Sequence, residues 1–332
     1  MDSELLPRFA VVDCGTNTFT LHIAEMEGGD WKSVFRQRRF VRLGRDSFRS
    51  GRLSPQRMLR GVDVLRSFHE TACNHGVQWA RAFGCSAVRD AANGDAFVRA
   101  ALETGWHVEV LDGDTEAAMI HTGVADTLNQ EPAWPDALLT VDIGGGSVEL
   151  VHWSESEVMG SWSLDLGVAR LTDWIKPSDP LKQQDIASIC RIADAAWAPA
   201  LEAMAARPPQ WLIGTSGAFN ALLAMQDPAS KWSDRRVAEA FDLPALKARC
   251  GALGAKTMEE LHAIPGLHPD RIPYLSVASI LIGHMLECFS SVERVMRSRH
   301  TLAEGALVQA AREWQRSGQA PQGWSPLRAT VC

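Results

Sequence analysis

The stretch "TVDIGGGSVEL", residues 140–150, joins two apolar runs through a turn of almost bare backbone. The first run ends near Asp142, three glycines and Ser147 follow, and the second run carries Glu149. Glycines let backbone N–H groups approach a phosphate closely, a serine adds a donor, and an aspartate at a strand end can hold hydrated Mg²⁺. Tight hairpins use the same residues, so this stretch alone is equally typical of a structural turn.

The same pattern occurs near the N-terminus, in "FAVVDCGTNTFTLHIAEM", residues 9–26. Aligning the two copies places Asp13 on Asp142, Gly15 on Gly144, Thr16 on Gly145, Asn17 on Gly146 and Thr18 on Ser147. Two copies, each preceded by an aspartate, favour a pair of phosphate-binding loops over a pair of unrelated turns. They also indicate two similar half-domains.

Length and composition agree with a two-domain protein. The chain has 332 residues and a mass of 36.3 kDa, which exceeds what one hydrophobic core usually spans. The N-terminus carries acids where a signal peptide needs a basic segment, and the longest apolar stretch, residues 274–289, is too short and polar to span a bilayer. The seven cysteines form no CxxC pair, so their spacing suggests neither a disulfide framework nor a zinc site. We expect a soluble, cytoplasmic protein without membrane contact.

The net charge of −7 argues against a nucleic-acid-binding protein, which normally has a basic domain. Residues 36–52 depart from this balance, with seven arginines against one aspartate. Two interpretations of this arginine segment stay open: an ordinary solvated face, or a surface that attracts anions.

Alternating and helical periodicities predict an α/β protein in which strands and helices follow one another in each half. Phe19, Leu21 and Ile23 are expected to point inward from the second strand. Ser54 and Pro55 predict a helix start. We expect strands over residues 9–14, 19–26, 31–43, 79–85 and 106–111 and helices from 54 to about 76, after 93 and from about 113.

Seven stretches in order resemble the exopolyphosphatase and guanosine pentaphosphate phosphatase (Ppx/GppA) family. They are "DCGTNTF", "RLGRDSFRSGRLS", "SAVRDAANG", "LDGDTEA", "DIGGGSVEL", "LDLGVARL" and "IGTSGAF", and the resemblance covers residues 9 to about 310. It implies two ribonuclease-H-like domains of the actin-like ATPase superfamily, which includes sugar kinases, actin and heat-shock ATPases, with an interdomain cleft. The chain would be a short two-domain form.

The resemblance also implies roles for individual residues. Both glycine loops, Gly15 to Thr18 and Gly144 to Ser147, would bind phosphates, and Glu116 would be the catalytic base. Asp142, Glu149 and Asp13 match positions that hold Mg²⁺ or another divalent cation, Glu149 also acting on the attacking water, and Arg89 matches an arginine that contacts the phosphate chain. Phosphoanhydride hydrolysis fits such a set, because it needs positioning, charge neutralisation and an oriented water.

Three of these residues have plain structural alternatives. Glu116 could be a helix-start residue after a cap at Gly113. Glu149 could be a solvent-facing position of an amphipathic strand. Arg89 could be a surface arginine in a first helical turn.

The resemblance implies domain bounds as well. Residues 1–124 would form the N-terminal domain, rejoined by a helix at about 303–315, residues 125–302 would form the C-terminal domain, and 316–332 would be an irregular tail. One departure from the family is Ala303, which stands where an arginine is usual; Arg297, Arg299 or His300 are candidates to replace its anion contact.

We therefore expect an exopolyphosphatase-type hydrolase of acid anhydrides that releases terminal orthophosphate from polyphosphate by metal-assisted attack of water. Guanosine pentaphosphate or tetraphosphate is the alternative substrate. A non-catalytic sensor of the same ligands, or an actin-like ATPase or kinase, is the alternative of another class, and a homodimer is an open option.

Overall fold

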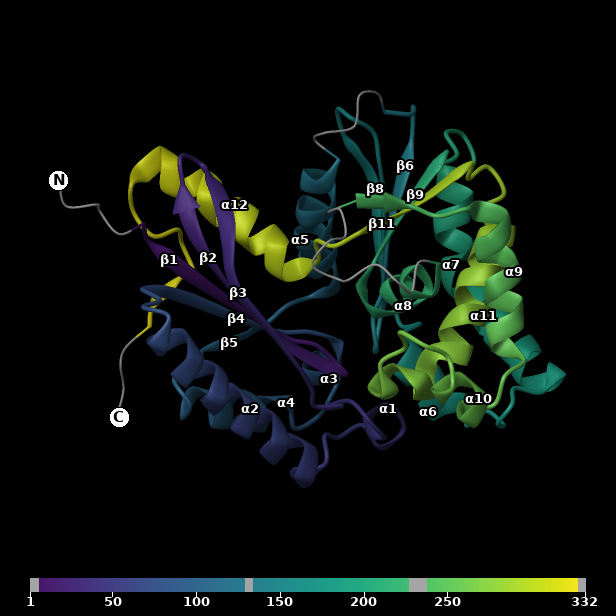
Figure 1. Cartoon of the computed structure of the whole chain (residues 1–332), viewed down its shortest axis with the longest axis horizontal. Helices are drawn as coiled ribbons and strands as arrows, with labels where there is room; N and C mark the ends of the chain where they lie inside the picture. The colour runs from purple at the N-terminus through teal and green to yellow at the C-terminus, as the bar shows by residue number, and fades with distance from the viewer. Residues whose placement is uncertain (1–5, 129–133, 227–237, 328–332) are drawn as a thin grey trace. The chain divides into compact units, whose positions relative to one another are not determined.

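The protein divides into two compact units, seen here in a computed structural model that describes residues 6–128, 134–226 and 238–327. Unit 1 contains residues 1–123 and 302–332, and unit 2 contains residues 124–301. The chain leaves unit 1 within helix α5 (Gly113–Thr127) and re-enters it at helix α12 (Leu302–Ser317) (Figure 1).

Unit 1 is built on a sheet of order β3-β2-β1-β4, in which β5 and β12 both pair with β4. β2 runs antiparallel to β1 and β3, whereas β1, β4 and β5 are parallel. Its strands are β1 (Arg8–Cys14), β2 (Thr18–Glu27), β3 (Asp30–Phe40), β4 (Trp79–Gly84), β5 (Val108–Val110) and β12 (Ser325–Pro326). Besides α5 and α12, its helices are α1 (Ser47–Ser50), α2 (Pro55–Asn74), α3 (Ser86–Arg89) and α4 (Gly94–Leu102).

Unit 2 repeats this arrangement with the order β8-β7-β6-β9-β11-β10, where β7 is antiparallel to its neighbours and β6, β9 and β11 are parallel. Its strands are β6 (Leu138–Ile143), β7 (Val148–Trp153), β8 (Val158–Leu164), β9 (Trp211–Thr215), β10 (Ala238–Ala240) and β11 (Arg294–Ser298). Its helices are α6 (Val168–Ile175), α7 (Gln183–Met204), α8 (Ser216–Gln226), α9 (Leu243–Gly254), α10 (Met258–His262), α11 (Ile272–Cys288) and the 3₁₀ helix η2 (Pro269–Arg271). The repeated order confirms the predicted pair of ribonuclease-H-like domains.

Both faces of the unit 1 sheet are buried. The alternation of apolar residues in β2 indicates burial of one face only. Phe19, Leu21 and Ile23 point into the core, as predicted, where they meet side chains of α2 and α4. His22, on the opposite face, is 2% exposed, because α12 from the far end of the chain covers that face (Figure 1). The second apolar layer includes Phe9, which packs edge-on against two tryptophans of the C-terminal segment.

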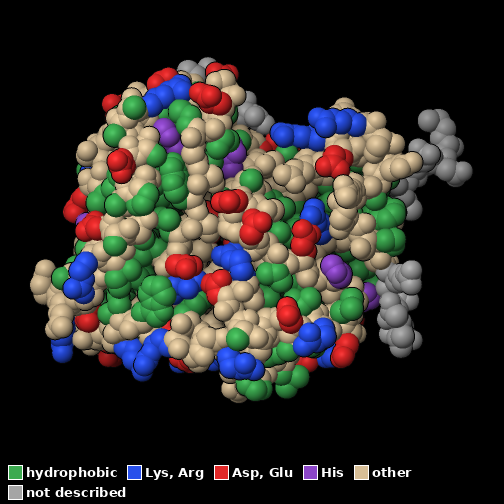
Figure 2. Space-filling model, turned by 180° about the vertical axis from the view of Figure 1, so that it is seen from behind, with side chains coloured by type: hydrophobic (Ala, Val, Ile, Leu, Met, Phe, Trp, Pro, Cys, Tyr) green, Lys and Arg blue, Asp and Glu red, His purple; other side chains and the backbone are tan. Residues whose placement is uncertain are grey.

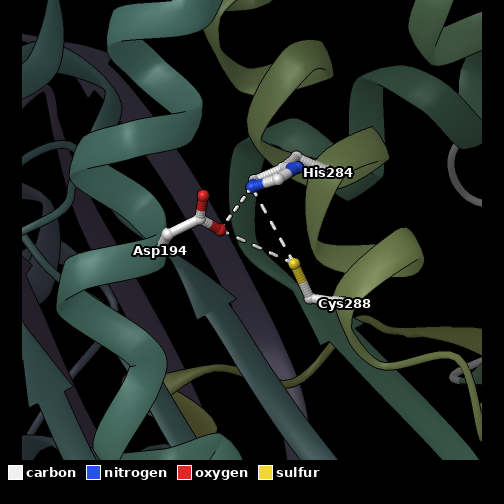
Figure 3. Close-up of side chains that lie close together, drawn as sticks. All are labelled: Asp194, His284 and Cys288. Atoms are coloured by element: carbon white, nitrogen blue, oxygen red, sulfur yellow. Dashed lines mark hydrogen bonds and ion pairs between the residues drawn. The ribbon is translucent and has the colours of Figure 1, made fainter.

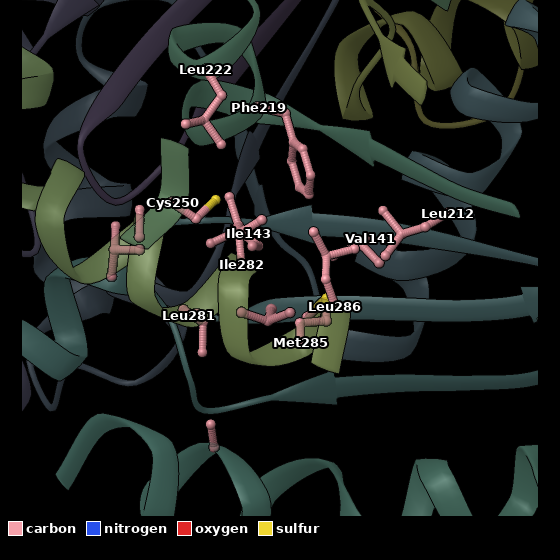
Figure 4. Close-up of a cluster of buried hydrophobic side chains, with 14 of the residues drawn as sticks. Val141, Ile143, Leu212, Phe219, Leu222, Cys250, Leu281, Ile282, Met285 and Leu286 are labelled. Carbon is pink, nitrogen blue, oxygen red and sulfur yellow. The ribbon is translucent and has the colours of Figure 1, made fainter. Parts of the chain in front are cut away.

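The core of unit 2 lies between one face of its sheet and α7, α9 and α11. Val141 and Ile143 of β6 and Leu212 of β9 contribute from the sheet, and Ile282 and Met285 contribute from α11 (Figure 4). The apolar stretch at 274–289 is therefore core helix. Within the described ranges, no helix is both long and apolar enough to cross a bilayer.

The C-terminal segment differs from the expected irregular tail. Helix α12 continues to Ser317, and Ser325 and Pro326 then pair with Ala80 and Trp79 of β4. Trp324 is buried against Phe9, so apolar burial holds this segment against the sheet. Periodicity missed the strand because it is two residues long.

Glycine 305 permits the close approach of α12 to α5, and we expect Gly305→Ala to destabilise the protein. A Cβ at this position would collide with the backbone of Met119 and Gly123. Overpacking of this kind costs about 1 to 3 kcal/mol of unfolding free energy. Urea denaturation of the purified variant measures the change.

The matched control is Gly251→Ala in α9, where an added Cβ meets nothing within 4 Å. Since alanine is the better helix former, this change should be neutral or stabilise by up to about 1 kcal/mol. Equal effects of the two substitutions would contradict the assigned helix contact.

Candidate active site

The glycine turn between β6 and β7 is bound through its carbonyl groups by the start of helix α6. The amides of Val168 and Ala169 donate to the carbonyls of Gly144 and Gly145, at 3.1 and 2.8 Å. Arg170 adds two bonds, from its amide to the Gly145 carbonyl at 3.1 Å and from its Nε to the Gly146 carbonyl at 2.6 Å. The carbonyl groups of the turn are thus occupied from one side. The amides of Gly145 and Gly146 take no part in these bonds.

Gly167 makes this contact possible. A Cβ on Gly167 would collide with the backbone of Gly145 and Gly146. The motif "LDLGVARL" noted in the sequence therefore packs against the backbone of the second glycine turn and holds it through hydrogen bonds to its carbonyls.

The turn between β1 and β2 is held in the same way. The amides of Val41 and Arg42 donate to the carbonyl of Asn17 at 3.0 and 2.8 Å, and the amide of Gly44 donates to the carbonyl of Thr16 at 3.0 Å. A Cβ on Gly44 would come within 2.6 Å of Thr16 Cγ2, so this support too approaches closely. The supporting segment of unit 1, residues 41–44, comes just after β3, and that of unit 2, residues 167–170, comes just after β8.

The first glycines of the two turns also have equivalent surroundings. A Cβ on Gly15 would lie 3.0 Å from the Thr18 carbonyl oxygen, and one on Gly144 would lie 3.1 Å from that of Ser147. The alignment made from the sequence therefore matches equivalent backbone positions. Backbone of this kind, with carbonyls occupied and amides outside those bonds, is suited to phosphate.

Asp142 and Glu149 face each other across β6 and β7. They are directly opposed in the antiparallel register, so their side chains share one face of the sheet. On the flanking strands Ser163 is opposite Glu149, and Thr215 is level with Asp142. The Ser163 hydroxyl donates to Glu149 Oε1 at 3.0 Å. A polar band therefore crosses four strands of unit 2.

Both carboxylates are largely buried. Glu149 is 2% exposed, so the interpretation of this residue as a solvent-facing strand position is wrong. Asp142 is 8% exposed. Directly opposed residues of an antiparallel pair have Cβ atoms about 5 Å apart, and two ionised groups at about that separation repel by about 3 kcal/mol at an effective dielectric constant near 20. Carboxylate oxygens are the hard ligands that Mg²⁺ prefers, so the donor set fits a divalent cation that would relieve this repulsion.

Unit 1 brings together Glu116, Arg89 and Asp13. Arg89 Nη1 donates to Glu116 Oε2 at 2.9 Å and to the Leu111 carbonyl at 2.9 Å. The Cys85 thiol lies between the two acids, with its Sγ 3.8 Å from Asp13 Oδ1 and in hydrogen-bond contact with Glu116. Because its guanidinium binds Glu116, the interpretation of Arg89 as a plain surface arginine is wrong.

Asp112 is the residue that caps α5. Its Oδ1 accepts the Thr115 amide at 2.7 Å, whereas the Glu116 carboxylate turns toward Arg89. Glu116 is 6% exposed, and this burial raises the pKa of its carboxyl above the ordinary value of 4.5 even though Arg89 lowers it. The cap is thus Asp112, one residue before the expected Gly113. A buried carboxyl with a raised pKa is a better proton acceptor than an exposed one.

Four residues around these groups were not identified from the sequence. Thr215 lies in the motif "IGTSGAF" and Arg170 in "LDLGVARL", so their motifs were visible although their contacts were not. Ser163 and Cys85 carried no signal, because their roles depend on strand register and on a loop contact. The joint action of the unit 1 and unit 2 groups across a cleft stays a prediction.

Two of the three candidate substitutes for the arginine missing at Ala303, Arg297 and His300, make ion-pair contacts within unit 2. Arg297 is fully buried, and its Nη2 lies 3.4 Å from Glu239 Oε1. His300 Nδ1 lies 3.5 Å from Asp126 Oδ2. Ala303 itself is fully buried in α12 of unit 1.

Comparisons with known proteins agree with the motifs. The sequence profile of the Ppx/GppA phosphatase family matches residues 22–313. Exopolyphosphatase 2 of Mycobacterium tuberculosis is 28% identical over 321 residues, covering 92% of this chain and 99% of its own.

Solved structures show the same fold. An exopolyphosphatase from Cytophaga hutchinsonii superposes with a TM-score of 0.85 at 29% identity, over 92% of this chain and 98% of its own. The Aquifex aeolicus Ppx/GppA family member superposes with a TM-score of 0.75 at 22% identity, over 95% and 100%. The family profile spans most of the chain, including Arg89, Glu116, Asp142 and Glu149 and the second glycine turn, and the chain therefore belongs to the Ppx/GppA phosphatase family and is a phosphohydrolase.

Proposed function

We propose that the protein hydrolyses the terminal phosphoanhydride bond of inorganic polyphosphate and releases orthophosphate. The observation that carries this proposal is the duplicated glycine turn, whose carbonyls are bound from one side in both units. Each turn is suited to a phosphate group, so a substrate built of repeated phosphates matches the donors that both units offer. The similarity to proteins named exopolyphosphatases, over nearly the whole chain, supports polyphosphate as that substrate.

The turns would bind phosphate through backbone N–H groups and the hydroxyls of Thr16, Thr18 and Ser147. These donors would position the phosphate groups. Positioning suits hydrolysis, because transfer of a phosphoryl group needs orientation and charge stabilisation more than covalent catalysis.

Asp142 and Glu149 would hold Mg²⁺ or another divalent cation, with Asp13 as a further candidate in unit 1. The cation would supply positive charge to the phosphate oxygens. The two carboxylates would in turn be relieved of their mutual repulsion, and the Ser163 hydrogen bond would fix the orientation of Glu149.

Glu116 would accept the proton of the attacking water. The water oxygen forms a bond to the terminal phosphorus while the bond from that phosphorus to the bridging oxygen breaks, and the bridging oxygen leaves with the shortened chain. Arg89 would orient the Glu116 carboxylate through its 2.9 Å hydrogen bond and would present its remaining N–H groups to the phosphate chain.

The arginine segment at 36–52 contributes fewer available charges than its composition indicates. Arg36 Nη1 lies 2.9 Å from the buried Glu304, so one of the seven arginines serves the contact between β3 and α12. Acidic and basic side chains are interspersed over the face drawn in Figure 2, in keeping with the modest net charge. An anion-attracting role for the other arginines is still a hypothesis.

The 5′ γ-phosphate of guanosine pentaphosphate is the second candidate substrate, because the matching family includes both activities in its name. A non-catalytic sensor is a weaker candidate, since Glu116, Asp142 and Glu149 are all present and buried.

A substrate panel with Glu116→Gln tests the proposal. With Mg²⁺ present, the parent should release orthophosphate from polyphosphate with a higher kcat/KM than from guanosine pentaphosphate. Glu116→Gln keeps the size of the side chain but removes the proton acceptor, so kcat should fall by roughly 10² to 10⁴ fold while polyphosphate binding persists.

Asp114→Asn is the matched control, because Asp114 is an exposed acid in the same turn of α5 and makes no contact with Arg89. Its kcat should stay within about twofold of the parent, since the surface charge of a helix start has only a small effect. A Glu116→Gln enzyme with near-parental kcat would refute the base assignment, and a parent that hydrolyses no phosphoanhydride would refute the enzyme proposal.

The pH profile gives a second test. The ionised Glu116 carboxylate is the active form, and burial favours the neutral form, so the acid limb of kcat/KM should lie above the ordinary pKa of 4.5. Arg89→Ala removes the hydrogen bond and charge that lower this pKa. The acid limb of that variant should therefore move to higher pH.

Arg99→Ala, which removes an exposed arginine from α4, should leave the limb where it is in the parent. If the limb of Arg89→Ala coincides with that of the parent, the two side chains do not form the proposed couple in the working enzyme.

Metal removal gives a third test. Excess EDTA should abolish orthophosphate release, and Mg²⁺ alone should restore it. Asp142→Asn should raise the Mg²⁺ concentration for half-maximal activity by about tenfold or more, because it removes one of two paired carboxylates. Glu155→Gln, an exposed acid in the turn after β7, should leave that concentration unchanged. Full turnover in EDTA would exclude the metal role.

A further inference from the structure

Helices α7 and α11 of unit 2 carry a second group of polar side chains, formed by Asp194, His284 and Cys288. The two helices pack on the sheet face to which Val141 and Ile143 point. Asp142, which alternates with them along β6, points to the opposite face. The group is therefore separate from the candidate magnesium site.

The three donor atoms converge on one point (Figure 3). His284 Nε2 lies 2.6 Å from Asp194 Oδ1, and Cys288 Sγ lies 3.8 Å from each of these atoms. A tetrahedral zinc ion with ordinary bond lengths needs about 3.6 Å between sulfur and the lighter donors and about 3.3 Å between nitrogen and oxygen. The sulfur distances already fit, and a change of less than about 1 Å between Asp194 and His284 would complete the set.

The helices fix this arrangement. His284 and Cys288 are four residues apart on α11 and so lie on one face of the helix. The His284 ring packs on the fully buried Trp197, with ring centroids 5.6 Å apart. Its Nδ1 lies 3.7 Å from Glu287 Oε2, so a second carboxylate faces the ring nitrogen that is turned away from the group. In metal sites a carboxylate that hydrogen-bonds this second nitrogen orients the histidine, and Glu287 is the carboxylate on that side.

The donor types select the metal class. Thiolate and imidazole favour zinc over magnesium or calcium, which prefer oxygen. The side chain of Asp194 is 55% exposed and that of His284 is 17% exposed, so an ion can reach the group and water can complete its coordination.

A nucleophilic cysteine with a histidine and an aspartate is the competing interpretation, and the geometry opposes it. In such a triad, one ring nitrogen faces the nucleophile and the other faces the acid. Here Nε2 is engaged by Asp194 at 2.6 Å while Cys288 Sγ lies 3.8 Å from it, and the acid on the Nδ1 side, Glu287, lies at 3.7 Å, beyond hydrogen-bond distance.

We propose that Asp194, His284 and Cys288 form a zinc site that links α7 to α11, with water in the fourth position. Zinc binding deprotonates the Cys288 thiol and replaces the hydrogen bond between His284 and Asp194, and the released protons pass to solvent. The ion ties the two helices on the outer side of the unit 2 core, so it should stabilise the folded protein by mass action.

Cobalt(II) is the direct probe, because a thiolate bound to cobalt gives a charge-transfer absorption that an all-oxygen site cannot give. The metal-free parent should bind one cobalt ion per chain with this absorption, zinc should displace it, and zinc alone should raise Tm by a few degrees. Cys288→Ser should lose the absorption and weaken zinc binding by at least about 10²-fold. Asp194→Asn, at an exposed position, tests a second ligand with little risk to folding.

Cys73→Ser is the matched control. His69 and Cys73 form a pair with the same four-residue spacing on α2, at 3.8 Å, and among the described residues no third metal-binding side chain joins them. This variant should bind cobalt and zinc as the parent does. Absence of the thiolate absorption in the folded parent, its persistence in Cys288→Ser, or its loss in Cys73→Ser would each overturn the proposal.

Discussion

The hydrogen bonds that hold the carbonyl groups of the two glycine turns are the constraint on which the candidate active site depends. In each unit, a segment that directly follows the third strand occupies these carbonyls, with Val41, Arg42 and Gly44 in unit 1 and Val168 to Arg170 in unit 2. Without these hydrogen bonds, the amides and carbonyls of a glycine turn would both be exposed to water, and the turn would adopt many conformations. With them, the backbone is fixed, and the amides of Gly145 and Gly146 take no part in the supporting bonds and can face an anion. The duplicated fold thus repeats a support as well as a loop.

The same sheet geometry explains why the acidic groups are buried. Antiparallel pairing of β6 with β7 sets Asp142 opposite Glu149, and the helical layer on the other face supplies the apolar burial that keeps the strands in register. Glu116 is buried for a different reason, since it lies in the first turn of α5 against Arg89 and Cys85. In each unit, the burial of ionisable side chains lowers the stability of the fold without contributing to its apolar core. Such groups are typical of functional sites.

Much of the fold was predictable because it is local. The two copies of strand, aspartate, small-residue turn and strand predicted equivalent backbone, and the Ser54 cap of α2 was visible from its own residues. The sequence was silent, or left a wrong alternative open, where a partner distant in sequence decides the outcome. His22 is buried because α12 covers it, β12 lies where Trp324 packs on Phe9, and the buried Glu149 accepts a hydrogen bond from Ser163 of β8. The group on α7 and α11 was invisible for the same reason, since Asp194 and His284 are 90 residues apart.

The most direct measurement is an NMR titration of the loop amides, in which a short polyphosphate is added to the uniformly ¹⁵N-labelled Glu116→Gln protein in Mg²⁺. The amide resonances of Thr16, Asn17, Gly145 and Gly146 should shift in a saturable manner as their N–H groups bind phosphate oxygens, while that of Gly251 in α9 should stay in place. Saturable binding of polyphosphate that leaves the resonances of both turns unchanged would contradict the claim that these turns hold the substrate.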